Sequence, residues 1–88
     1  MDFSNAAIAS HFEEIADWLE IQGENAFRVR AYRNAADTIT DLSTSLKGMV
    51  ERGEDISELK GIGTAIADKI KELLSTGKIA ALEKLRSD

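Results

Sequence analysis

The sequence predicts an all-α fold, a compact bundle of five or six short helices formed by one domain over residues 1–88. Apolar residues recur at intervals of three and four along each longer segment, as they do on one face of a helix. No stretch shows the alternation that is typical of a β-strand. The chain has no proline, and most of its six glycines follow or separate the apolar stretches, where helices end.

The first two predicted helices carry the clearest apolar faces. The first ends near Gln22, with Gly23 as a left-handed cap, and its apolar face comprises Ile8, Phe12, Ile15 and Leu19. Asn25 is suited to cap the second helix, whose apolar face comprises Val29, Tyr32, Ala36 and Ile39. We expect Trp18 to pack at an edge of the core.

Shorter helices are predicted after the polar stretch 41–45. The third helix ends at Gly53 and is centred on Leu46, Met49 and Val50. Asp55 and Glu58 have the spacing of a capping box, which predicts one or two helical turns through Leu59. Thr64 is suited to cap the next helix, whose apolar face comprises Ile66, Ala67, Ile70, Leu73 and Leu74. Gly77 closes it, and a last short helix is indicated by Ile79, Leu82 and Leu85.

Composition narrows the kinds of function that the chain can have. It has no cysteine and one histidine, His11, which excludes disulfides, thiolate metal sites and multi-histidine metal sites. No apolar run approaches the roughly 20 residues that cross a bilayer, and the start lacks a basic, apolar signal sequence. We therefore expect a monomeric cytoplasmic protein with a modest core and no membrane partner.

The charge of the chain is unevenly distributed along it. The net charge of −5 argues against diffuse binding to polyanions. Residues 1–26 hold six acids and no Lys or Arg, and residues 41–59 are also acidic overall. Residues 27–40 and 60–88 each carry an excess of two basic residues. The two basic segments can form one small, directed anion site if the fold brings them together.

Helical spacing also predicts how several charged residues are used. Arg33 flanks the apolar stripe of its helix and is expected to pair with an acid such as Asp37, its i+4 neighbour. Arg28 and Tyr32 are four residues apart and share one face. The acids of the first helix are expected to form a solvated face that repels DNA; they are Glu13, Glu14, Asp17 and Glu20.

The stretch GIGTAIA at 61–67 has the spacing of a tight turn between two helices. Gly61 and Gly63 permit positive φ and the close approach of an outside group, because neither has a Cβ. Ile62 can turn inward, and Ala67 is small enough for two helices to cross closely. The following helix starts with exposed N–H groups, where its dipole favours an anion. These features indicate a helix-hairpin-helix motif at 55–76, a common DNA-binding element that contacts phosphates and not bases. The alternative is a turn that only joins two helices.

Two stretches resemble the N-terminal domain of family X DNA polymerases: FRVRAYRNAA at 27–36, and GIGTAIADKI at 61–70 with TGK downstream. The likeness covers Asn5 to Arg86, is greatest with bacterial and archaeal members, and extends to the lyase domain of DNA polymerase beta. It implies binding to gapped or nicked DNA and 5′-phosphate ends, in repair or gap filling at the nucleoid. It also implies association with the remaining domains of a longer polymerase.

The resemblance assigns roles to individual residues. Lys69 takes the position of a lysine that in some members forms a Schiff base with an abasic deoxyribose. Arg28 matches a basic phosphate ligand, Tyr32 the pocket tyrosine, and Arg33 the arginine of a Tyr-Arg pair. DNA or phosphate contacts are implied at Arg28, Tyr32, Arg33 and Lys69, and at the hairpin residues Lys60, Gly61, Ile62, Gly63 and Thr64. No cofactor is implied except a monovalent cation, Na⁺ or K⁺, at the backbone carbonyls of Ser57, Leu59 and Ile62.

Three positions depart from the family pattern. Ala65 and Ala81 stand where the vertebrate enzyme has lysines in its phosphate pocket, and Lys60 replaces the proline usual before the turn. The loss of two cations puts lyase activity in question. Lys69 itself lies at an edge of its helix's apolar stripe, where partial desolvation favours the neutral amine that a Schiff base needs. The alternative is that its stem lies along apolar surface with the ammonium in water.

Three functions remain open at this point. The first is sequence-independent DNA binding, the second is a 5′-deoxyribose-phosphate lyase that uses Lys69, and the third is a protein docking module. The chain lacks the carboxylate cluster that holds two Mg²⁺ ions for nucleotidyl transfer, so polymerase chemistry is not expected in it. Whether it is a fragment or a free-standing protein is also open.

Overall fold

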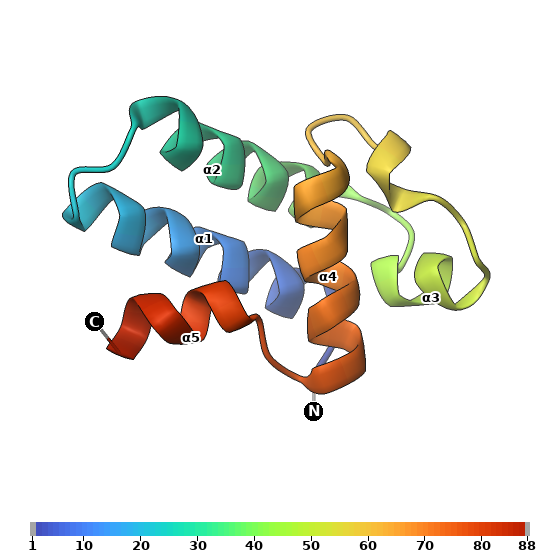
Figure 1. The fold of residues 1–88 in the computed structure, drawn as a ribbon. Helices are drawn as coiled ribbons and strands as arrows, with labels where there is room; N and C mark the ends of the chain where they lie inside the picture. The colour runs from blue at the N-terminus through green and yellow to red at the C-terminus, as the bar shows by residue number, and fades with distance from the viewer. Residues whose placement is uncertain (1, 88) are drawn as a thin grey trace.

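Two long helices, α1 (Asn5–Ile21) and α2 (Ala26–Asp41), lie side by side and antiparallel in the computed structural model, which describes residues 2–87 (Figure 1). The elements that follow are α3 (Leu46–Glu51), the 3₁₀ helix η1 (Ile56–Glu58), α4 (Thr64–Thr76) and α5 (Ala80–Ser87). In Figure 1, α4 runs across one end of the α1–α2 pair and α5 returns along α1. All of these elements are helical, which confirms the predicted fold class.

Local signals at the helix ends explain where α1 and α2 stop and start. Gly23 has a φ of 72°, and the amide of Glu24 bonds to the carbonyl of Leu19 at 2.9 Å. This is the left-handed turn predicted after α1. The side chain of Asn25 accepts a hydrogen bond from the amide of Phe27 at 2.7 Å, as predicted for a cap of α2. The turn therefore fixes where the first residues of α2 lie relative to the end of α1.

A single apolar core joins every element. The rings of Phe12 and Tyr32 are stacked between α1 and α2, with centroids 6.2 Å apart. All eight residues of the two predicted apolar faces are buried, and Trp18 lies partly exposed at the core edge. No polar or charged residue is buried in the part of the chain that the structure describes. The polar groups that could bind a ligand therefore lie at the surface.

The turn between η1 and α4 packs closely against α2. Gly61 has a φ of +80°, and a Cβ at this position would lie 3.1 Å from the Thr38 hydroxyl. Ile62 is buried in the core, and its amide donates to the carbonyl of Leu59 at 2.9 Å. Gly63 differs from our expectation, because its φ of −88° and ψ of −178° are open to any residue. Only the first glycine is required by the backbone of the turn.

One ion pair holds α5 against α1. The Arg86 guanidinium donates to both carboxylate oxygens of Glu14, at 2.6 and 2.7 Å. The indole N–H of Trp18 donates to the same carboxylate at 3.0 Å. These hydrogen bonds, those from Arg86 first, lower the pKa of Glu14 to about 2. The expectation that Glu14 belongs to a free solvated face is therefore wrong, because its carboxylate links two helices.

Serine at each hairpin glycine should separate the roles of the two positions. Gly61→Ser must adopt a positive φ beside Thr38, so we expect the free energy of unfolding to fall by about 1–3 kcal/mol. Gly63→Ser can cap α4 and should change it by about 0.5 kcal/mol or less. Urea unfolding followed by circular dichroism measures both. Equal losses of stability in the two variants would contradict this view of the turn.

Glu14→Gln should weaken the attachment of α5. The pKa of Glu14 is lowered from 4.5 to about 2, so its contribution is complete above about pH 5 and is lost as the pH falls towards 2. We expect a loss of about 1 kcal/mol at pH 7, discounted because the carboxylate is partly exposed, and a flatter stability profile between pH 5 and 2. The exposed Glu51→Gln is the control. Parallel pH profiles for Glu14→Gln and the parent would contradict the assignment.

Candidate nucleic-acid interface

The start of α4 presents backbone donors to solvent. Gly63 is the N-cap of α4 and offers no side chain, and Thr64 is the first helical residue rather than the predicted cap. The N–H groups of 63–66 have no acceptor among the described residues. Nothing lies within 4 Å of a Cβ placed on Gly63, so the space in front of these donors is open. The helix dipole adds positive potential at the same place, which suits an anion.

Two further features of the hairpin suit a ligand at its surface. Lys60, Thr64 and Ala65 are exposed beside the turn, so a cationic side chain flanks the free amides. Ile62 is buried, so this predicted contact residue can offer only its backbone to DNA. The side chain of Ile62 thus anchors the turn while the neighbouring backbone faces outward.

The three carbonyls proposed for a monovalent cation lie around the same turn. The Leu59 carbonyl accepts one hydrogen bond, from the amide of Ile62, and keeps a second lone pair. Within residues 2–87, the backbone amides make no bond to the carbonyl of Ile62 outside the regular helices. Neutral carbonyl oxygens are suitable ligands for an alkali cation. This donor set therefore fits the predicted cation, which remains a proposal.

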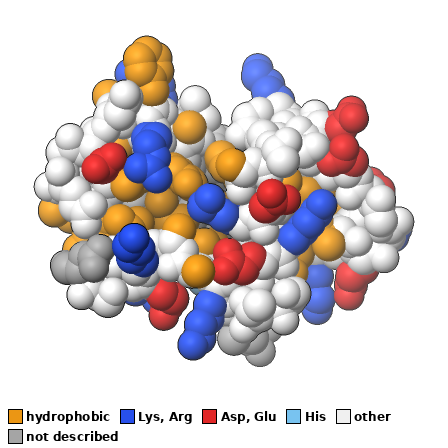
Figure 2. Space-filling view, in the orientation of Figure 1, with side chains coloured by type: hydrophobic (Ala, Val, Ile, Leu, Met, Phe, Trp, Pro, Cys, Tyr) orange, Lys and Arg blue, Asp and Glu red, His pale blue; other side chains and the backbone are white. Residues whose placement is uncertain are grey.

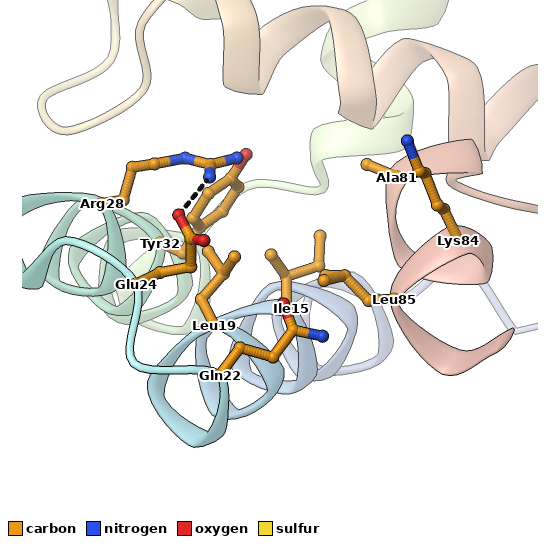
Figure 3. Close-up of a pocket in the computed structure, with 9 residues that line it drawn as sticks. All are labelled: Ile15, Leu19, Gln22, Glu24, Arg28, Tyr32, Ala81, Lys84 and Leu85. Atoms are coloured by element: carbon orange, nitrogen blue, oxygen red, sulfur yellow. Dashed lines mark hydrogen bonds and ion pairs between the residues drawn. The ribbon is translucent and has the colours of Figure 1, made fainter. Parts of the chain in front are cut away.

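A hollow of about 250 Å³ lies between α2 and α5, above α1. Its lining comes from α1, α2, α5 and the turn between α1 and α2: Ile15, Leu19, Gln22, Glu24, Arg28, Tyr32, Ala81, Lys84 and Leu85. Figure 2 shows apolar side chains gathered between α2 and α5, with basic side chains around them. Figure 3 shows Arg28 and Lys84 on opposite walls, with Ile15, Leu19 and Leu85 between them. The hollow thus combines an apolar floor with two walls that each carry a basic side chain, and on one wall the carboxylate of Glu24 pairs with Arg28.

Arg28 and Tyr32 share one face of α2, as predicted, and both line the hollow. Tyr32 is mostly buried against Phe12 and lines the hollow one helical turn beyond Arg28. Arg28 is not free, because its Nη1 lies 3.2 Å from a carboxylate oxygen of Glu24. The structure therefore brings together a cation, a phenol and a carboxylate at one wall.

Arg33 is held elsewhere, by α1. Its guanidinium bonds to three acids of α1 at 3.0–3.2 Å: Glu13, Asp17 and Glu20. The pKa of Arg33 is raised, chiefly by the hydrogen bond to Asp17. The prediction that Arg33 pairs with an acid is confirmed, but its partners lie on α1 and Asp37 is not among them. Asp17 and Glu20 remain exposed, as predicted, although their carboxylates are paired with Arg33. Arg33 lies outside the hollow and makes the contact between α1 and α2 partly ionic.

The other predicted pocket positions lie in different places. Lys69 is half-buried on α4 and does not line the hollow, and neither does Ala65. Ala81 does line it, so one lysine that the family pattern would supply is absent there. Lys84, which our sequence reasoning did not single out, lies one turn further along α5 and enters the hollow. Its spacing of three residues from Ala81 is the signal that could have identified it.

The described residues hold neither a metal-ligating cluster nor a membrane-spanning helix. No group of three or more His, Asp or Glu side chains in residues 2–87 could hold a metal ion. No helix within the same range is long and apolar enough to cross a membrane. The hairpin and the hollow are the two places where the described residues bring predicted contact residues together.

Comparisons with known proteins agree with this geometry. The chain matches the family described as "Helix-hairpin-helix domain" over residues 3–79. It is also 37% identical over 76 residues to the DNA polymerase/3′-5′ exonuclease PolX of Bacillus subtilis (strain 168). That match covers 86% of this chain but only 13% of PolX. The likeness therefore concerns one small region of the longer protein.

Proposed function

Since the chain belongs to the helix-hairpin-helix domain family, we propose that it binds DNA through backbone phosphates and independently of sequence. The likeness to PolX bears out the resemblance to family X DNA polymerases that two stretches of the sequence indicated. The observation that carries the proposal is the uncapped start of α4, which presents backbone donors behind an open Gly63.

The hairpin suits a phosphate better than a base. Its donors are main-chain amides at a helix start, which form charge-assisted hydrogen bonds to a phosphate oxygen. Lys60 adds a point charge beside them and carries no sequence information. The turn offers no exposed aromatic ring for stacking, since its central residue is the buried Ile62. The backbone carbonyls of Ser57, Leu59 and Ile62 would hold a monovalent cation, Na⁺ or K⁺, which would add positive charge beside the bound phosphate.

We assign the hollow to the end of a DNA strand. Arg28 and Lys84 form two cationic walls, and the apolar floor suits the face of a terminal sugar. A site built from two walls is suited to a projecting 5′-phosphate rather than to continuous duplex backbone. This supports gapped or nicked DNA as the proposed target, in gap filling or repair. The remaining domains of a longer polymerase are the proposed neighbours of the chain.

Gly63→Asp tests the hairpin assignment without removing the fold. Aspartate is a favoured N-cap, so α4 should be as stable as in the parent or slightly more so. The same carboxylate occupies the donors and repels phosphate, so we expect affinity for gapped DNA to fall at least about ten-fold. Fluorescence anisotropy at low salt measures the affinity, and urea unfolding checks the stability.

Ser10→Asp is the matched control, because it adds one negative charge at an exposed position of α1 outside the hairpin. Its affinity should stay close to that of the parent. For the parent, log K should fall by about 0.7–0.9 per decade of salt for each phosphate contacted. A folded Gly63→Asp variant that binds DNA as well as Ser10→Asp would refute phosphate binding at the hairpin.

A second candidate function is deoxyribose-phosphate lyase activity through Lys69. Its support is that Lys69 is half-buried on the helix that the hairpin starts, which restricts the position of its amine. In this reaction the amine attacks the aldehyde carbon of the opened sugar, and water leaves to give an imine. Loss of a proton from the carbon next to the imine then breaks the C–O bond to the phosphate, so the DNA strand leaves with its 5′-phosphate, and water hydrolyses the imine to free Lys69. The absence of a lysine at Ala81 leaves the hollow with fewer cations to hold the sugar phosphate.

Borohydride trapping on 5′-incised abasic DNA tests the lyase proposal. We expect a weak covalent adduct that Lys69→Ala abolishes, because the imine needs that amine. Lys71→Ala, an exposed lysine two residues further along α4, should leave the adduct unchanged. An adduct that survives Lys69→Ala would exclude this lysine as the nucleophile, and no adduct in the parent would exclude the activity.

A further inference from the structure

The hollow already contains a carboxylate. Glu24 lines it from the turn before α2, and its oxygen lies 3.2 Å from Nη1 of Arg28 (Figure 3). This is the only ion pair of Arg28 among the described residues. A carboxylate and a phosphate present similar oxygens to a guanidinium. Glu24 therefore occupies the guanidinium of Arg28, which an entering anion would bind.

The backbone of Glu24 is more constrained than its side chain. The backbone is fixed by the left-handed turn at Gly23 and by the bond from its amide to the Leu19 carbonyl. The side chains of the pair remain 43% exposed for Glu24 and 58% for Arg28. An ion pair this exposed is weak, because water screens it and both side chains lose freedom in forming it. The carboxylate can thus leave Arg28 while its backbone stays in place.

We infer that Glu24 is an internal competitor for the anion site and lowers its preference for a terminal phosphate. In the free protein its carboxylate neutralises Arg28 in the hollow, and a phosphate must displace it. After displacement, the carboxylate remains near the anion and repels it. Glu24 is in this sense a specificity-determining residue, because it acts on 5′-phosphate ends and not on hairpin contacts. This inference rests on the assignment of the hollow to a strand end.

The test compares two substitutions that each remove one negative charge. Glu24→Gln removes it from the hollow, and Asp37→Asn removes it from the exposed opposite side of α2. Asp37 is nine residues beyond Arg28, which at about 100° per residue places it half a turn away. Affinities are measured for one-nucleotide gapped DNA that carries either a 5′-phosphate or a 5′-hydroxyl. The preference is the ratio of these two affinities.

Glu24→Gln should raise the preference for the phosphate by about two- to five-fold, the range expected for loss of an exposed ion-pair competitor. Asp37→Asn should change both affinities equally and leave the preference unaltered. In an Arg28→Gln background, Glu24→Gln should give no gain. An unchanged preference, a gain matched by Asp37→Asn, or a gain that persists without Arg28 would overturn the inference.

Inorganic phosphate gives an independent readout that does not depend on DNA. Titration followed by NMR at the Arg28 side chain should show binding about two- to five-fold tighter in Glu24→Gln than in the parent. Equal binding would overturn the role of Glu24. If neither DNA binds but this difference is found, the DNA-binding proposal fails while the competition at the hollow stands. If both DNAs bind and the preference does not change, only the competition fails.

Discussion

The close contact between the hairpin turn and α2 determines what the rest of the hairpin can do. Gly61 approaches α2 so nearly that a Cβ would meet Thr38, and this approach allows Ile62 to enter the core. With the only large side chain of the turn buried, the backbone that follows is left at the surface. Gly63 adds no side chain that could cap it. The backbone donors proposed to bind an anion are therefore exposed because of how the turn packs.

The charges of α1 resolve the conflict between an acidic chain and a proposed DNA-binding role. Three acids of α1 form ion pairs with Arg33 of α2, and Glu14 forms one with Arg86 of α5. These ion pairs attach α2 and α5 to α1. Net charge counts these four carboxylates in full, and the two arginines that pair with them offset half of that negative charge locally. A ligand at the hairpin or in the hollow meets only the charged and polar groups that lie there. In those places backbone amides, Lys60, Arg28 and Lys84 lie at the surface.

The helices could be predicted from patterns between residues close together in the sequence. The sites could be predicted only in part, because they depend on contacts between residues far apart in the sequence. The apolar faces of α1 and α2 and the Asn25 cap follow from residues within one or two turns of each other, so periodicity and capping rules find them. The partners of Arg33 and Arg86 lie as far as 20 and 72 residues away, which no local rule can connect. The cap of α4 was misplaced by one residue, because Thr64 has capping chemistry and Gly63 has the extended backbone. Lys84 was missed for a related reason, since only the packing of α5 on α1 brings it opposite Arg28.

The two proposed sites differ in how they depend on charge, and this difference separates their roles. The amides at the start of α4 are part of the backbone, so exposed substitutions elsewhere leave their number and direction unchanged. The hollow depends on a few exposed side chains, and one of its two cations is already paired with Glu24. The proposed contact with the DNA backbone therefore depends on the fold itself, whereas the proposed recognition of a strand end depends on single side chains. Ala81→Lys would add a cation to the hollow and leave the backbone amides at the start of α4 unchanged. In this chain, the hairpin is the constant part of the proposed interface and the hollow is the adjustable part.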